Sequence, residues 1–132
     1  PDYLISAACQ LVLAQRLARR SCKDCRVPDD DVTPKVLQDL GFSPEQASRV
    51  KALKGKGCAK CKDTGYKGRQ GIYEILVVSK PVKEAILRKA TTPELRQIAI
   101  KEGFQTMQDM GRRLIANGEL NFREYERVLA SE

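Results

Sequence analysis

The spacing of hydrophobic and polar positions predicts a mostly helical chain with one small strand. Residues 3–20 are apolar on most sides, with Leu4, Ala8 and Leu11 along one face. This pattern predicts a helix packed inside a larger body, whose last turn carries arginines that suit the C-terminal end of the helix dipole. Residues 72–78 are rich in β-branched side chains and predict a strand.

Capping signals predict two short helices in the middle of the chain. Thr33 is followed by proline, and Gly41 ends the apolar segment behind it, which is typical of a helix with proline first and glycine after its end. Ser43 begins a second helix, because Gln46 three residues later completes a capping box.

The last third of the chain predicts four further helices from their caps, stops and apolar faces. They are expected over residues 80–89, from Thr92 to the stop at Gly103, from Met107 to Asn117, and after an Asn121 cap with Glu124 three residues on.

Three glycines precede the predicted strand at a spacing of three: Gly65, Gly68 and Gly71. Glycine tolerates backbone angles that other residues avoid, so the spacing predicts a turn. As a phosphate-binding loop the segment is a weak match, because it lacks a strand before it and a helix after it.

The composition limits the chain to one domain, or to one small domain with an attached element. Of the 132 residues 5% are aromatic and none is Trp, so the expected hydrophobic core is thin. A bound structural zinc contributes about 10–16 kcal/mol of apparent free energy in small cysteine-rich peptides, whereas the net stability of a domain is about 5–15 kcal/mol. A metal would therefore decide whether the central region folds.

Two CxxC pairs are the strongest chemical signal in the chain. Cys22 and Cys25 form the first pair, Cys58 and Cys61 form the second, and 32 residues separate the pairs. Two such pairs supply four sulfur ligands to a tetrahedral structural zinc, and four sulfurs leave no open position for catalysis. Neighbouring lysines and arginines favour the thiolates that bind metal. The alternatives are two disulfides or reduced cysteines in a core.

The net charge of +7 is concentrated beside the second CxxC pair. Residues 49–69 hold eight basic residues against the single acid Asp63, and residues 29–48 are mainly acidic. A basic stretch of this kind indicates nucleic acid, anionic lipid or an acidic protein as partner. The plainer alternative is a solvated surface that partly neutralises a zinc–thiolate cluster.

Signals for catalysis and for membrane insertion are missing from the sequence. There is no His to act as a base or metal ligand, and no G-x-x-x-x-G-K-[ST] phosphate loop. A carboxylate such as Glu74 is interpreted as one half of an ion pair with Arg69 or a lysine.

The N-terminal apolar stretch is too short for a membrane span. Its free thiol, Cys9, is expected to be buried and suits a reducing compartment. Because the chain begins at Pro1, it is expected to be a fragment of a longer protein.

The motifs resemble those of the bacterial secretion-type hexameric ATPases. Residues 14–25 read AQRLARRSCKDC, residues 57–61 read GCAKC, and residues 64–75 read TGYKGRQGIYEI; each is similar to a stretch of that family. The order of motifs in the tail is similar as well, and the resemblance covers essentially the whole chain. One departure is Ser21, where members of the family often carry Leu. The branch most similar in pattern is the type IV pilus assembly ATPases, followed by the type II secretion ATPases.

The resemblance implies an organisation in three parts: residues 1–20 as the end of a RecA-like ATPase core, including its last helix, residues 21–75 as a tetracysteine zinc-binding subdomain, and residues 76–132 as a C-terminal helical subdomain. It implies that ATP and Mg²⁺ bind in an upstream motor core, so the fragment itself is not expected to be catalytic. It also implies a homohexamer at the cytoplasmic face of the bacterial inner membrane.

The same resemblance implies a function for the zinc-binding part. It is expected to be a lever or docking surface toward an inner-membrane platform protein, with the basic stretch facing acidic protein or an anionic lipid surface rather than nucleic acid. The competing hypothesis is a nucleic-acid-binding zinc ribbon, although Tyr66 and Tyr73 are not interleaved with the basic residues as a stacking array requires. A third hypothesis is a redox or chaperone module with a labile cysteine pair.

Overall fold

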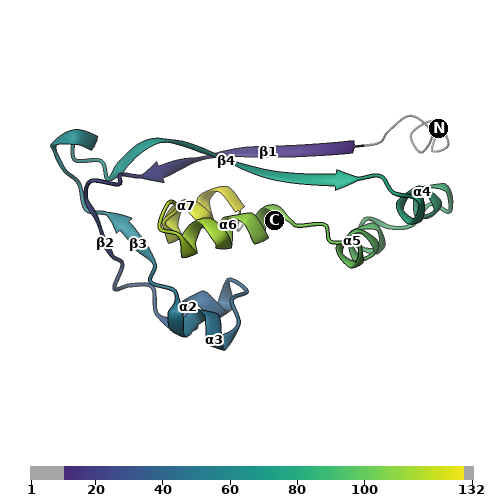
Figure 1. The fold of residues 1–132 in the computed structure, drawn as a ribbon, viewed down its shortest axis with the longest axis horizontal. Coiled ribbons are helices and arrows are strands. Elements are labelled where there is room, and N and C mark those ends of the chain that lie inside the picture. The colour runs from purple at the N-terminus through teal and green to yellow at the C-terminus, as the bar shows by residue number, and fades with distance from the viewer. Residues whose placement is uncertain (1–10, 130–132) are drawn as a thin grey trace. The chain divides into compact units, whose positions relative to one another are not determined.

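The computed structural model describes residues 11–129. The described segment contains both helices and strands (Figure 1). Their order is β1 (Leu11–Ser21), β2 (Arg26–Pro28), α2 (Pro34–Asp39), α3 (Pro44–Arg49), β3 (Leu53–Gly55), the 3-10 helix η1 (Ala59–Cys61), β4 (Tyr66–Val77), α4 (Lys80–Leu87), α5 (Thr92–Lys101), α6 (Met107–Ala116) and α7 (Phe122–Leu129).

The predicted N-terminal helix is wrong for the part that the structure describes. Residues 11–21 form β1, which pairs with β4, and the two strands run in opposite directions (Figure 1). Leu, Ala, Gln and Arg have good helix propensity, but hydrogen bonding to a long partner strand overrides so weak a preference. The remainder of the predicted helix, and Cys9 within it, lie outside the described residues.

The strands are longer than predicted, so the fold is a mixture of helix and strand rather than mostly helical with a small β element. β4 begins at Tyr66, which places Gly68 and Gly71 inside a strand instead of a turn. The left-handed backbone angles expected of the glycines do occur, at Gly65 (φ 80°) and Gly68 (φ 83°). Pairing with β1 extends the strand through a segment whose glycines suggested a loop.

The helix predictions made from caps are confirmed. The Thr33 side chain accepts from the backbone N–H of Val36 at the start of α2, and Ser43 and Gln46 form the reciprocal capping box of α3. In the tail, α5 is capped by Thr91, one residue before the predicted start. Asn121 accepts from the backbone N–H of Glu124 at 2.8 Å and so begins α7 as predicted.

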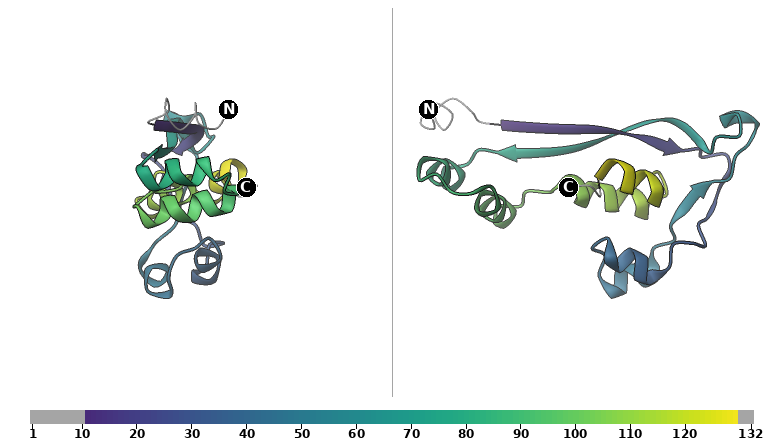
Figure 2. Two further views of the ribbon diagram at one scale, coloured as in Figure 1. Left: turned by 90° about the vertical axis from the view of Figure 1, so that its right-hand side faces the viewer. Right: turned by 180° about the vertical axis from the view of Figure 1, so that it is seen from behind.

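The described chain divides into two compact units. Of the described residues, 11–15 and Tyr73–Thr106 form one unit, within which α4 packs on α5 (Figure 2). Its buried side chains include Val82, Ala85 and Ala99.

The other unit comprises Arg16–Ile72 and residues 107–129 and holds all four cysteines of the CxxC pairs. Within it α2 packs on α3, α6 packs on α7, and β2 pairs antiparallel with β3 so that Val27 lies opposite Lys54. Its fully buried core includes Leu37, Ile72, Ile115, Leu120 and Leu129. Helices from the end of the chain therefore belong to the same unit as the cysteines.

Among the described residues, no helix is long and apolar enough to cross a membrane.

Candidate metal centre

The fold brings the four cysteines of the two CxxC pairs together. Their sulfur atoms all lie within 4.8 Å of one another. The Cys22 and Cys58 sulfurs are 3.8 Å apart, those of Cys25 and Cys61 are 3.9 Å apart, and those of Cys58 and Cys61 are 3.7 Å apart. The cluster joins segments 36 residues apart in sequence.

These spacings fit a single tetrahedral metal ion. A zinc–sulfur bond of about 2.3 Å and a tetrahedral angle place neighbouring sulfurs about 3.8 Å apart. A disulfide requires sulfurs about 2.05 Å apart, and the four cysteines are free thiols. The donor set, four sulfurs and no oxygen or nitrogen, is that of structural zinc sites.

The second CxxC segment is shaped by its own local backbone. The 3-10 helix η1 turns the chain between its two cysteines, and Lys62 and Asp63 then adopt left-handed angles (φ 55° and 62°). This turn lets the backbone N–H of Cys58 donate to the Cys61 sulfur at 3.2 Å. The Thr64 hydroxyl donates to the Cys61 carbonyl at 2.7 Å and fixes the end of the turn.

Gly65 connects the two CxxC segments. Its N–H donates to the Cys61 sulfur at 3.2 Å, and its carbonyl accepts from the backbone N–H of Cys22 at 2.9 Å. A Cβ at this position would lie 2.5 Å from the carbonyl oxygen of Gly55, so only glycine fits without rearrangement. The sequence marked Gly65 as a turn residue but gave no sign of this bridging role.

The first CxxC segment depends on other parts of the chain. The backbone N–H of Ser21 donates to the Glu119 carbonyl at 2.9 Å, and the N–H of Gly57 donates to the Cys25 sulfur at 3.3 Å. Ser21 is fully buried, and its hydroxyl has no hydrogen-bond partner among the described residues.

Hydrogen bonding and burial shift the pKa values of the Cys61 and Cys25 thiols in opposite directions. Burial raises the pKa of Cys61, but the amides of Cys58 and Gly65 and the adjacent thiols outweigh it and lower that pKa to about 6. For Cys25, burial dominates over the single amide of Gly57, and with the neighbouring thiols it raises the pKa to about 11. These hydrogen bonds favour the thiolate form of Cys61, which is the form that binds a metal.

The surroundings of the cluster are charged but not uniformly basic. Four thiolates with one divalent metal carry a net charge of −2. Lys60 pairs with Asp24 at 3.9 Å, and Lys54 pairs with Asp29 at 4.0 Å. The basic stretch seen in the sequence is thus partly neutralised by acids from the first half of the chain.

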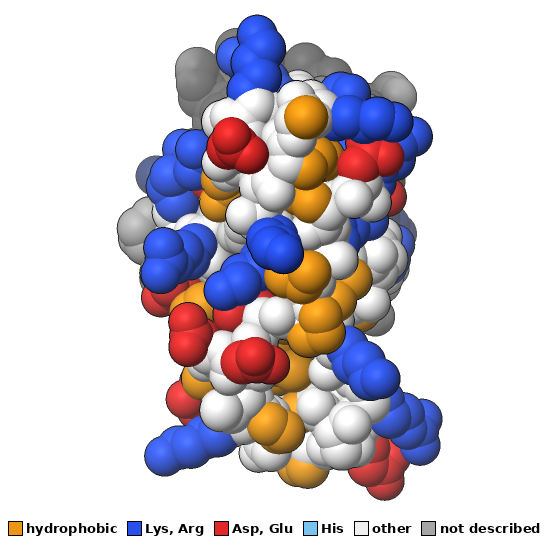
Figure 3. Space-filling view, turned by 90° about the vertical axis from the view of Figure 1, so that its left-hand side faces the viewer, with side chains coloured by type: hydrophobic (Ala, Val, Ile, Leu, Met, Phe, Trp, Pro, Cys, Tyr) orange, Lys and Arg blue, Asp and Glu red, His pale blue; other side chains and the backbone are white. Residues whose placement is uncertain are grey.

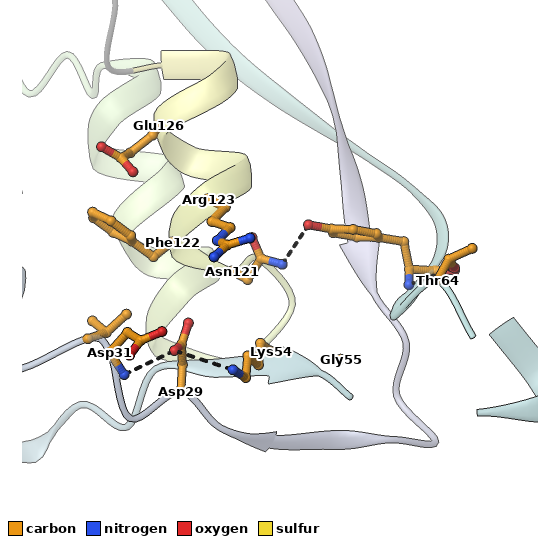
Figure 4. Close-up of a pocket in the computed structure, with 11 residues that line it drawn as sticks. Asp29, Asp31, Lys54, Gly55, Thr64, Asn121, Phe122, Arg123 and Glu126 are labelled. Carbon is orange, nitrogen blue, oxygen red and sulfur yellow. Dashed lines mark hydrogen bonds and ion pairs between the residues drawn. The ribbon is translucent and has the colours of Figure 1, made fainter. Parts of the chain in front are cut away.

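A pocket of about 460 Å³ lies in the same unit, between the start of α7 and the β2–β3 pair. In Figure 4, Asp29 lies between Lys54 and the backbone of Asp31, and Asn121 hydrogen-bonds a tyrosine side chain. Because its charged residues are of both signs, the pocket matches no single ligand charge. It is lined by Asp29, Asp31, Val32, Lys54, Gly55, Thr64, Tyr66, Asn121, Phe122, Arg123 and Glu126.

Sequence reasoning missed a buried carboxylate in this unit. Glu124 is 0% exposed and pairs with both Arg19 and Arg127. Burial by itself would raise the pKa of the Glu124 carboxyl, but the hydrogen bonds from Arg127 and Arg19 outweigh burial and lower this pKa to about 2. The Asn121–Glu124 spacing identified the helix cap, whereas nothing in the local sequence indicated the distant Arg19. Glu74, in the other unit, forms an ion pair with Arg96 at 3.7 Å; the partner expected from the sequence was Arg69 or a lysine.

Comparison with known proteins assigns the chain to a family. A profile of the family described as "Type II/IV secretion system protein" matches residues 1–127. The chain belongs to this family. The resemblance noted in the CxxC motifs is thereby confirmed.

Individual members of the type II/IV secretion family are similar over most of the chain. The Type IV pilus assembly ATPase PilB of Myxococcus xanthus is 35% identical over 122 residues, which are 92% of this chain and 22% of the relative. PilB of Thermus thermophilus is 41% identical over 112 residues, or 83% of this chain and 12% of the relative. The Type II secretion system protein HxcR of Pseudomonas aeruginosa is 31% identical over 126 residues, or 96% of this chain and 23% of the relative. The chain spans at most about a quarter of these relatives.

Proposed function

We propose that this chain is the zinc-binding C-terminal part of a motor ATPase that powers type IV pilus assembly or type II secretion. The names of the similar proteins support the motor assignment, since both a pilus assembly ATPase and a type II secretion protein match nearly the whole chain. In this proposal ATP and Mg²⁺ bind in an upstream RecA-like core, whose last residues are 1–20. Residues 21–75 form the zinc-binding subdomain and residues 76–132 the C-terminal helical subdomain, whose helices α6 and α7 lie in the same compact unit as the cysteines.

The observation that carries the role of this part is the spacing of the four sulfurs. Cys22, Cys25, Cys58 and Cys61 hold a structural zinc that fixes the ends of β1 and β4 to each other. Zinc when bound supplies only cross-linking, because four sulfurs complete its coordination. The residues of the chain itself provide rigidity. Backbone amides orient the sulfurs, and the backbones of the two CxxC segments hydrogen-bond to each other.

A rigid element next to a motor is suited to transmit motion. In the homohexamer at the cytoplasmic face of the inner membrane, this part acts as a lever or docking surface toward the platform protein. Its basic residues face acidic protein or anionic lipid. On the face shown in Figure 3, Lys and Arg side chains stand at separate places among Asp and Glu, an arrangement that suits a protein partner better than a continuous nucleic-acid backbone.

The test begins with metal content. We expect one zinc per chain by elemental analysis, and loss of that zinc in Cys58→Ser. Purified protein that retains no metal would contradict the zinc assignment.

The docking role is tested separately, by binding of the zinc-loaded protein to the cytoplasmic domain of the platform protein and to vesicles of anionic phospholipid over a range of salt concentrations. Absence of binding to both at every salt concentration would contradict it. Salt-sensitive binding to random DNA in a filter assay, without binding to either, would favour the zinc-ribbon alternative.

A further inference from the structure

Glu124 is the buried centre of an ionic network with two half-exposed arginines. The carboxylate accepts five hydrogen bonds. Three come from Arg19: the backbone N–H at 2.7 Å, Nε at 3.0 Å and Nη2 at 2.7 Å. Two come from Arg127, at 2.7 Å from Nε and 2.8 Å from Nη2. A carboxylate bound by two guanidinium groups is held in one orientation, because each arginine presents its donors in a planar fork.

The network extends from α7 to both strands that lead into the cysteines. The Arg19 guanidinium lies over the ring of Tyr66, 4.2 Å from its centre. The side-chain amide of Asn121 donates to the Tyr66 hydroxyl at 2.9 Å, a bond drawn in Figure 4. Residues at the start of α7 are therefore fastened to β1 through Arg19 and to β4 through Tyr66.

From these two strand residues the path to the sulfurs is short. Arg19 precedes Cys22 by three residues on β1. Tyr66 directly follows Gly65, which donates to the Cys61 sulfur and accepts from the backbone N–H of Cys22. A displacement of β1 would thus move Cys22, and a displacement of β4 would disturb the Gly65 hydrogen bonds to both Cys22 and Cys61.

We propose that the Glu124 network positions the zinc-binding cysteines, so that helix α7 determines how tightly the metal is held. The inference rests on the zinc occupancy proposed above. Groups that orient metal ligands without touching the metal typically change metal affinity 10- to 100-fold when they are altered. Glu124 is a positioning residue of this kind, although 62 residues separate it from the nearest cysteine in sequence, Cys61.

The two arginines of the network provide a matched pair for the test. Arg19 and Arg127 are exposed to a similar degree, 51% and 54%, and each donates two side-chain hydrogen bonds to Glu124. Arg19 also lies over the ring of Tyr66 and precedes Cys22 by three residues, whereas Arg127 is on α7. Replacement of Glu124 removes both ion pairs at once and does not separate positioning from folding, whereas Arg19→Gln and Arg127→Gln do.

The experiment measures the rate at which the zinc-loaded protein transfers its metal to a chromogenic chelator. We expect Arg19→Gln to release zinc about 10-fold faster than the unmodified protein, and Arg127→Gln to release it at nearly the unmodified rate. In cobalt-substituted protein the thiolate–cobalt absorption bands should shift in Arg19→Gln alone. Glu74→Gln, which removes an ion pair in the other unit, is the remote control.

Equal release rates and identical cobalt spectra in the two arginine variants would overturn the inference. That result leaves the zinc assignment intact, because the metal content of the unmodified protein is measured first. Conversely, an unmodified protein without zinc would contradict the proposed function and the inference together.

Discussion

The two CxxC segments reach the same cluster by different physical means. The second is organised by its immediate neighbours: η1, the left-handed Lys62 and Asp63, and the Thr64 hydroxyl all lie within three residues of Cys61. The first has a turn closed by one long hydrogen bond, from the Cys25 N–H to the Cys22 carbonyl at 3.4 Å, and is held mainly by distant residues, namely Glu119, Gly65 and, through Arg19, Glu124. One half of the site is therefore encoded locally, and the other half forms only when the chain has folded around it.

This difference has a consequence for assembly. We expect the second pair to be ordered by its own turn, whereas the first pair reaches the cluster only where β1, β4 and α7 come together. The following predictions test that contrast, beginning with the largest expected effect.

Removal of the metal should disorder both CxxC segments, so that the locally organised one no longer differs from the other. With zinc contributing about 10–16 kcal/mol in small cysteine-rich peptides, chelation is expected to unfold the segment from Cys22 to Gly65. Hydrogen exchange should then show loss of amide protection in this segment, while α4 and α5 in the other unit keep theirs. Full protection of the cysteine segment without metal would show that packing alone holds it.

Gly65→Ala should break the connection between the two CxxC segments. The new Cβ would lie 2.5 Å from the Gly55 carbonyl oxygen at a backbone φ of 80°, so we expect a loss of roughly 3 kcal/mol or more in the free energy of unfolding. Gly68→Ala is the matched control. It has φ 83° but no atom within 4 Å of the new Cβ, and should lose only about 1 kcal/mol. Similar losses in denaturant unfolding of the two variants would contradict the bridging role of Gly65.

The Glu124 ion pairs that hold the first CxxC pair should make the free energy of unfolding depend on pH. The folded pKa of Glu124 is about 2, below its ordinary value of 4.5. Its stabilisation is therefore fully present above pH 4.5 and is lost as the pH falls toward 2. We expect Glu124→Gln to lower the free energy of unfolding by about 2 kcal/mol at neutral pH, less than the full pKa shift implies because both arginines are half-exposed.

Denaturant unfolding in excess zinc measures this deficit at several pH values. It should stay constant from about pH 8 to about pH 5.5, since Glu124 remains ionised throughout. The deficit should shrink only as the pH falls from 4.5 toward 2. A deficit that stays unchanged there would mean that the carboxylate keeps its ordinary pKa of 4.5 in the folded state and is not held by the two arginines.

Ser21→Ala should give the smallest effect, and of opposite sign. The Ser21 hydroxyl is buried beside Cys22 without a hydrogen-bond partner among the described residues, so its removal relieves an unsatisfied polar group. We expect the free energy of unfolding to rise by up to about 1 kcal/mol, with unchanged zinc stoichiometry. A fall in thermal stability would indicate that the hydroxyl is hydrogen-bonded in solution, for instance to an ordered water.

The sequence by itself determined the features that depend on neighbouring residues. The caps of α2, α3 and α7 were predictable because Thr33, Ser43 and Asn121 bond to amides three residues away. The four candidate metal ligands were predictable for a similar reason, since CxxC spacing places two sulfurs on one turn.

Only the tertiary structure decided the rest. Residues 11–21 became a strand because β4 lies along them, and local propensity cannot register a partner more than 40 residues away. For the same reason Glu124 showed no sign of its ion pair with Arg19, 105 residues earlier in the chain. Hydrophobic periodicity and motif spacing predict structure that depends on neighbouring residues. Strand pairing and buried ion pairs depend on which distant segments the folded chain brings together.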